Sequence, residues 1–270
     1  MLSVSGIHAM RLKPVARQSL SDAVFDQLSQ EIVHGRMRPG APLPSERALC
    51  DMLDVNRGAV REALKRLSQA GLISIQHGGG TRVLDFKQTA SLDLLTRLLF
   101  RSDGTIDLRV ARSVMEMRAA MAPDIARLAA TRRSDEQAQQ LAEIVASMAG
   151  LQHDLLALQS LALQFWDLLV LGSDNIAYQL AFNSLRLTYD RLREALVEVM
   201  GEELRDLAAY RSITDAVRRG DEAAAGRVAR ALMQEGSRGV LQLLAAIEES
   251  SGNDAPDNDE EEEDDDDDRA

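Results

Sequence analysis

Residues 42–83 constrain the fold of this chain most strongly, because their pattern predicts two short helices and a hairpin in a fixed order. Ser45 and Asn56 each precede apolar residues at helical spacing, and both residue types favour the N-cap position. Gly71 ends the second predicted helix, and an alternating strand pattern follows it. Three consecutive glycines at 78–80 predict the hairpin tip, since glycine tolerates sharp turns. The segment therefore predicts a helix-turn-helix with a β wing.

Basic side chains on the second predicted helix suggest what this motif contacts. Arg57, Arg61, Lys65 and Arg66 lie off its apolar stripe. A helix-turn-helix places its second helix in the major groove, where side chains near the N-terminus reach base edges. The alternative is an ordinary solvated helix face, but the order of helices, wing and arginines favours DNA. For His77, a structural role in the turn and a DNA contact both stay open.

Several short motifs match a known pattern. They are Pro39-Gly40, Leu43 to Arg47, Val55-Asn56-Arg57, Val60 to Leu64, Leu67, Gly71-Leu72, Ile75 to Gly78, and Thr81 with Val83. On these residues the segment resembles the N-terminal domain of the GntR family of bacterial repressors, and within it the FadR-like branch. The resemblance implies a transcription regulator that binds double-stranded operator DNA.

The resemblance also implies which residues contact DNA. Arg47 and Arg57 would read guanines, because a guanidinium donates bidentately to O6 and N7 of that base. Two positions that often bear hydroxyls in the relatives are Gly58 and Ala59 here, so two phosphate contacts are missing or come from backbone amides. The full implied set, with phosphate contacts from Asn56 and Arg61 and minor-groove contacts from the wing, is Arg47, Asn56, Arg57, Gly58, Ala59, Arg61, His77 and Gly78.

Charge distribution and periodicity predict four regions. Residues 248–270 hold 14 carboxylates and one arginine, so the other residues carry a net charge of +1 although the whole chain carries −12. Such a self-repelling run predicts a disordered tail. We expect a flexible N-terminus at 1–12, a winged helix-turn-helix domain at 13–86, a helical domain at 91–249 and an acidic tail at 250–270.

Beyond residue 90 the apolar periodicity is helical almost throughout. This predicts an all-α antiparallel bundle for effector binding and dimerisation, and hence a mostly α protein overall. The predicted helices are residues 91–100, 108–131, 135–149, 154–171, 177–200, 202–219 and 221–249. No apolar run is expected to reach the roughly 18 residues that span a bilayer, so we expect a cytoplasmic, nucleoid-associated protein.

In GntR relatives the helical domain often holds a metal through one aspartate and three histidines. Aligned on the turn at residues 172–175, the first two of these positions are Ala162 and Trp166 here. By spacing to Ile213 and to Gly220-Asp221, the other two are Tyr210 and Leu232. Three nitrogen ligands are missing, so no metal of that type and no cofactor is expected. The four histidines, at positions 8, 34, 77 and 153, form no catalytic spacing, so we do not expect an enzyme.

Lacking the metal ligands, the helical domain more closely resembles the branch that senses fatty acyl-CoA. The resemblance suggests ligand contacts by Arg118, Trp166, Tyr189, Glu235 and Ser237, although core packing is the alternative for each apolar position. Two-fold symmetric recognition of paired half-sites predicts a homodimer. A constitutive architectural DNA-binding protein, whose bundle only dimerises it, is the alternative function.

Overall fold

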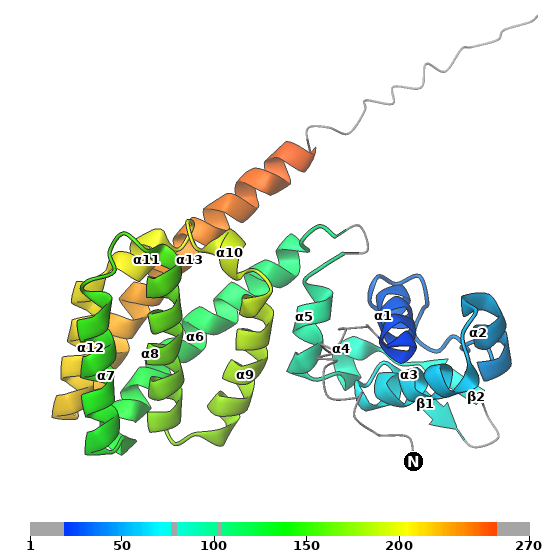
Figure 1. Ribbon diagram of the computed structural model, residues 1–270, viewed down its shortest axis with the longest axis horizontal. Coiled ribbons are helices and arrows are strands. Elements are labelled where there is room, and N and C mark those ends of the chain that lie inside the picture. Colours follow the sequence, from blue (N-terminus) through cyan, green and yellow to red (C-terminus); the bar gives the residue numbers. More distant parts are fainter. Residues whose placement is uncertain (1–18, 77–79, 102–103, 253–270) are drawn as a thin grey trace, which may run out of the picture. The chain divides into compact units, whose positions relative to one another are not determined.

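The computed structural model describes residues 19–76, 80–101 and 104–252 (Figure 1). The predictions for residues 1–12, His77, Gly78 and most of the acidic tail therefore lie outside the described residues. The chain divides into two compact units, one ending at Thr105 and the other beginning at Ile106. Each unit is considered by itself below.

The first unit contains the predicted helix-turn-helix and wing. Its elements are α1 (Leu20–Val33), α2 (Glu46–Leu53), α3 (Arg57–Gln69), β1 (Ile73–Gln76), β2 (Gly80–Val83), α4 (Phe86–Thr89), η1 (Leu92–Leu94) and α5 (Leu95–Leu98). Ser45 and Asn56 cap α2 and α3 by accepting from backbone amides, as their sequence positions predict. The turn between these helices includes Asp54 in the left-handed region, at φ 49°.

The core of this unit joins the helices to the wing. Helix α1 packs on α3, and the strands β1 and β2 pair antiparallel with Ile73 opposite Val83. The inward side chains of α3, Val60 and Leu67 among them, are fully buried. Because one apolar face of α3 is covered in this way, its opposite face is left for solvent or a ligand.

The boundary of the first domain differs from the prediction. Residues 91–105, assigned above to the helical domain, belong to the first unit, and Leu94 is buried in its core with Phe86 and Leu98 packed against it. Local periodicity predicts the helical character of this segment but not the surface that it covers. The domain boundary therefore lies at 105/106 rather than near residue 90.

Two arginines secure this segment and α3 to α1. Arg66 of α3 and Arg97 of α5 each have their guanidinium over the ring of Phe25, at 4.4 and 4.2 Å from the ring centroid. Each also forms an ion pair with a carboxylate of α1, namely Asp22 and Asp26 respectively. Arg66 therefore has an intramolecular role, and it is not part of the basic surface expected from the sequence.

Gly71, between α3 and β1, holds a close backbone contact. Its φ is +74°, and a Cβ at this position would lie 2.4 Å from the carbonyl oxygen of Thr89. The Thr89 hydroxyl donates a hydrogen bond of 2.6 Å to the Gly71 carbonyl oxygen. Only glycine meets both conditions, so this residue fixes α4 against the end of α3.

The second unit is a helical bundle (Figure 1). Its helices are α6 (Leu108–Arg132), α7 (Asp135–Met148), α8 (Leu155–Gly172), α9 (Ile176–Asp190), α10 (Arg193–Leu196), α11 (Gly201–Arg205), α12 (Leu207–Arg219) and α13 (Glu222–Gly252). Helix α6 packs along α13, and α12 contacts α6, α7 and α13. The predicted mostly helical fold is confirmed.

Two of the predicted helices are broken in the structure. The stretch 177–200 divides after Asp190 into α9 and α10, and 202–219 divides at Asp206 into α11 and α12. Asp206 acts as an N-cap, because its carboxylate accepts from the amide of Ala209 at 2.9 Å. Neither break carries a glycine or proline, which explains why periodicity alone predicts continuous helices.

Candidate DNA interface and effector site

The start of α3 presents Arg57 to solvent. Asn56 precedes it, and the Asn56 Oδ1 accepts from the amide of Ala59 at 2.9 Å, which fixes the first turn. Arg57 is exposed, and its side chain makes no hydrogen bond or ion pair with any residue of the described ranges. An unpaired guanidinium at the N-terminus of a recognition helix has the geometry that bidentate base reading requires.

The other two arginines of the expected set are exposed but differ in their partners. The Arg47 side chain is 83% exposed, and its Nε lies 4.0 Å from the Asp51 carboxylate, a surface pair of little energetic weight. The Arg61 Nε donates to Glu46 Oε2 at 2.9 Å, and this hydrogen bond raises the pKa of Arg61. Arg61 therefore links α2 and α3, and a phosphate would have to compete with Glu46 for it.

Gly58 and Ala59, the two residues that lack hydroxyls, have different surroundings. Gly58 is exposed, whereas Ala59 is only 9% exposed and packs into the core. The amide of Ala59 already donates to Asn56. Burial and capping thus engage the side chain and the amide of Ala59, which leaves Gly58 as the more accessible of the two residues.

The capping role of Asn56 can be separated from a DNA-binding role by two substitutions. Asn56→Ala removes the cap and should lower the free energy of unfolding by about 1 kcal/mol, measured by urea denaturation of the full chain. Asn56→Asp keeps a capping oxygen and should leave stability within about 0.5 kcal/mol of the parent chain, because aspartate caps as well as asparagine. Its negative charge should still weaken DNA binding. Equal DNA affinity for the parent chain and Asn56→Asp would contradict the assignment of Asn56 to the DNA interface.

Inside the bundle, charged and polar side chains meet away from solvent. Arg118 of α6 donates from Nη2 to Glu203 Oε1 of α11, and the Glu203 side chain is 1% exposed. Burial raises the pKa of Glu203, and it raises the pKa of Tyr189 to about 12. Among the described residues, this region contains five buried polar atoms without a hydrogen-bond partner: Arg118 Nη1, Trp166 Nε1, Glu203 Oε2, Tyr210 Oη and Ser237 Oγ.

Comparison with known proteins identifies both units. The family model described as "Bacterial regulatory proteins, gntR family" matches residues 20–83, and the FCD domain model matches residues 113–235. The HTH-type transcriptional regulator Mce2R of Mycobacterium tuberculosis is 38% identical over 237 residues, covering 88% of this chain and 98% of that protein. The chain belongs to the GntR family.

Other matches are more distant. The fatty acid metabolism regulator protein of Serratia proteamaculans is 30% identical over 178 residues, covering 66% of this chain and 72% of that protein. A solved structure of Lar, described as controlling the Listeria monocytogenes agr system, covers 85% of this chain at a TM-score of 0.54 and 15% identity. At 15% identity, the likeness to Lar shows a similar fold and nothing more. Relatives and domain models alike are those of transcription regulators rather than enzymes.

The FCD domain of this GntR regulator brings together four of the five expected ligand residues. Arg118, Tyr189 and Trp166 all lie close enough to Tyr210 to influence the pKa of its hydroxyl, the first two through charge and Trp166 through its indole N–H. Ser237 is buried on α13, directly after Gly236, whose Cα lies against the Glu203 carboxylate. The remaining residue, Glu235, lies apart from this group: it is exposed and accepts two hydrogen bonds from Arg238 on the same helix, at 2.7 and 2.8 Å.

The metal positions of the family are filled by residues that do not suit a metal. Ala162, Trp166, Tyr210 and Leu232 are all buried, and only Tyr210 offers an oxygen. Within the described ranges, no group of three or more histidine, cysteine, aspartate or glutamate side chains could hold a metal ion. These residues therefore do not fit the family's metal, and buried polar groups occupy its surroundings instead.

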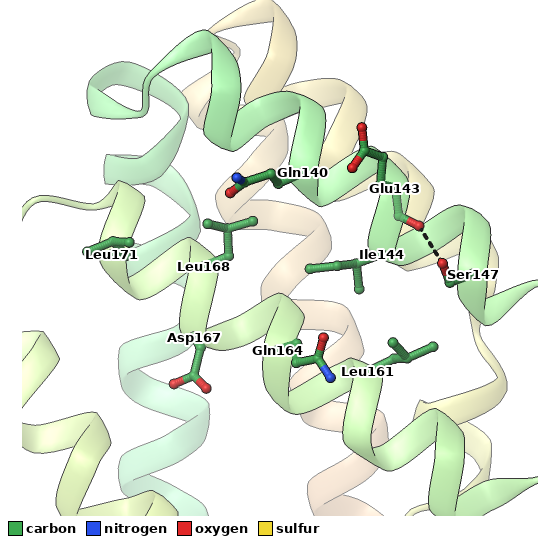
Figure 2. A pocket seen from close by; sticks show the side chains of 9 residues that line it. All are labelled: Gln140, Glu143, Ile144, Ser147, Leu161, Gln164, Asp167, Leu168 and Leu171. Atoms are coloured by element: carbon green, nitrogen blue, oxygen red, sulfur yellow. Dashed lines mark hydrogen bonds between the residues drawn. The ribbon is translucent and has the colours of Figure 1, made fainter.

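A groove of about 500 Å³ lies elsewhere, between α7 and α8 (Figure 2). Glu143 and Ser147 of α7 and Gln164 and Asp167 of α8 are among the residues that line it, and the Ser147 hydroxyl donates to the Glu143 carbonyl oxygen at 2.9 Å. Burial raises the pKa of Asp167. None of the expected ligand residues lines this groove.

One helix of the bundle contradicts the expectation that no apolar run is long enough to span a bilayer. Helix α8 has 18 residues at a mean hydropathy of 1.6, so it is long and apolar enough to cross a membrane by length and composition. Half of it is buried inside the bundle, where Phe165 and Leu169 are fully covered. An apolar core helix passes the same test, and this one helix is weak evidence for a membrane span.

Proposed function

We propose that a small metabolite bound in the FCD domain controls the affinity of this regulator for its operator. The supporting observation is the buried group of polar side chains around Arg118, because small-molecule sites place a few converging polar groups in an otherwise apolar lining. Relatives named as fatty acid metabolism regulators make a fatty acyl-CoA the first candidate. Ligand binding would shift the population of domain arrangements away from the one that fits the operator.

We further propose roles for the residues at the DNA interface. Arg47 and Arg57 read guanines. The structural support is stronger for Arg57, because it is exposed and has no intramolecular partner in the described ranges, whereas Arg47 lies near Asp51. Asn56, Gly58 and Arg61 would contact the phosphate backbone. His77 and Gly78 are assigned to the minor groove on the family resemblance alone.

The proposed assembly is a homodimer acting in the cytoplasm at the nucleoid. Two recognition helices related by a two-fold axis match two half-sites of an operator. Helix α9 carries an exposed apolar stripe at helical spacing, formed by Ile176, Leu180 and Leu187. This stripe supplies apolar surface for a second copy. Sedimentation equilibrium of the full chain tests the assembly, and a monomer at micromolar concentration contradicts it.

The effector proposal is tested by a gel shift on the upstream region of the regulator's own gene, with and without oleoyl-CoA. Release from DNA should accompany thermal stabilisation, because a ligand at 100 times its Kd stabilises the native state by about 2.7 kcal/mol. A panel of acyl-CoAs and organic acids extends the search. DNA binding that no member of the panel weakens, with no shift in melting temperature, would favour a constitutive architectural protein.

Removing the acidic segment 253–270 should tighten non-specific DNA binding at low salt. This segment holds 12 carboxylates and one arginine, and its charge competes with phosphates for the basic face of the first domain. The gain should shrink as ionic strength rises, because salt screens this competition. Fluorescence anisotropy on a random duplex measures it, with a chain of equal length bearing neutral residues at 253–270 as the control. Equal affinity at every salt concentration excludes the competition.

A further inference from the structure

The wing of the first unit is paired with a third extended segment, residues 40–43. The Gly40 amide donates to the Val83 carbonyl oxygen at 2.8 Å, and Pro42 lies opposite Arg82 in an antiparallel bridge. Strand β2 is therefore paired on both of its edges, with β1 on one side and with residues 40–43 on the other. This pairing fixes the position of the wing relative to the segment that leads into α2.

A tight turn precedes this segment and carries an arginine at its first position. The Ala41 amide donates to the Arg38 carbonyl oxygen at 3.0 Å. Pro39 and Gly40 occupy the two central positions, and Gly40 has a φ of +83°, as a type II turn requires. The Arg82 Nη1 donates to the Gly40 carbonyl oxygen at 2.9 Å. Arg38 and Arg82, called the wing-base pair below, therefore bring two cationic side chains to one turn beside the wing.

No carboxylate among the described residues neutralises the wing-base pair. Both side chains are exposed, Arg38 has no hydrogen-bond or ion-pair partner in the described ranges, and Arg82 has only the neutral carbonyl of Gly40. The carboxylates nearest to the pair in sequence are bound by other groups, and these bonds are Glu31 with Arg36 at 2.9 Å, Glu46 with Arg61 at 2.9 Å and Asp85 with Gln88 at 2.7 Å. Two like charges at one turn without a counter-charge favour an external anion.

We propose that the wing-base pair binds backbone phosphates of DNA beside the minor groove, in addition to the residues assigned to DNA above. This inference rests on the proposed placement of the wing in the minor groove. Arg82 lies two residues beyond Gly80, the first described residue after the predicted tip, which is about 7 Å along the strand. The minor groove is only about 6 Å wide, so an arginine this far from the tip meets the bordering backbone rather than base edges. A guanidinium matches the geometry of phosphate oxygens.

Arg38→Ala and Arg82→Ala in the full chain test this contact through the salt dependence of DNA binding. Each should lower the slope of log affinity against log salt concentration by about 1, because one phosphate contact fewer releases about one counter-ion fewer. Each should also weaken binding about threefold to tenfold at a fixed salt concentration. The factor should be equal on the operator and on a random duplex, because a phosphate contact carries no base preference. Fluorescence anisotropy between about 50 and 200 mM salt measures both effects.

Two further variants separate the phosphate contact from other effects. Lys87→Ala is the matched control, because it removes one exposed positive charge from α4, which Thr89 and Gly71 hold at the end of α3 opposite to Arg57. It should leave the slope unchanged. Arg82→Lys keeps the charge and should keep the slope of the parent chain. Arg38→Ala keeps the inference testable if Arg82→Ala disturbs the turn.

Unchanged slopes in both alanine variants overturn the inference. A slope that Lys87→Ala lowers equally overturns it too, because the effect would then be one of net charge. So does an Arg82→Lys variant that behaves as Arg82→Ala does, because Arg82 would then only support the turn. The proposed DNA interface fails separately, when Arg57→Ala and Arg61→Ala also leave operator affinity unchanged.

Discussion

Glu203→Leu should lower the free energy of unfolding of the full chain by about 3–5 kcal/mol, because it leaves the guanidinium of Arg118 buried without a counter-charge. Side-chain exposures of 1% for Glu203 and 22% for Arg118 make water a poor substitute for the lost partner. Urea denaturation followed by circular dichroism measures the change. The Arg118–Glu203 ion pair is therefore expected to be costly to disrupt from one side only.

The neighbouring residue provides the matched control for this prediction. Glu202 lies on the same helix and is exposed, so Glu202→Leu should change stability by less than about 0.5 kcal/mol. The double variant Arg118→Met with Glu203→Leu should recover much of the loss, because an apolar pair replaces the buried charges. A double variant as unstable as Glu203→Leu alone would show that packing, and not the unpaired charge, dominates the cost.

Sequence reasoning succeeds in the helix-turn-helix because its signals are local. Ser45 and Asn56 cap the helices that they precede, and Gly71 has the positive φ expected at the end of a helix. These signals depend on neighbours within a few residues. The fold of the first domain therefore follows from its sequence with little tertiary information.

The same reasoning fails where a contact joins distant parts of the chain. Leu94 lies in a helical pattern that fits either domain, and only its burial assigns it to the first. Glu202 and Glu203 are identical neighbours in sequence, yet one is exposed and the other is buried beside Arg118. Glu235 was expected at the ligand site but pairs with Arg238 in solvent. Burial of a single charge depends on tertiary packing, which no local pattern encodes.

Arg57→Ala should weaken binding to the cognate operator by about 1–3 kcal/mol and relax base preference at one position of each half-site. The structure leaves this guanidinium exposed at the start of α3 and, within the described ranges, free of intramolecular partners, so the loss is of a DNA contact and not of a fold contact. Fluorescence anisotropy on the operator and on a random duplex of equal length measures both effects.

Two further variants decide whether Arg57 reads a base or only attracts phosphate. Arg57→Lys keeps the charge but loses the bidentate fork, so it should retain affinity for random DNA while losing preference for guanine. Lys65→Ala, on the same helix and exposed, should weaken both duplexes by a similar factor and reduce the salt dependence. If Arg57→Ala behaves as Lys65→Ala does, with equal losses on operator and random DNA, Arg57 is a phosphate contact. Sequence recognition would then have to come from Arg47 or from the wing, because Arg61 is already paired with Glu46.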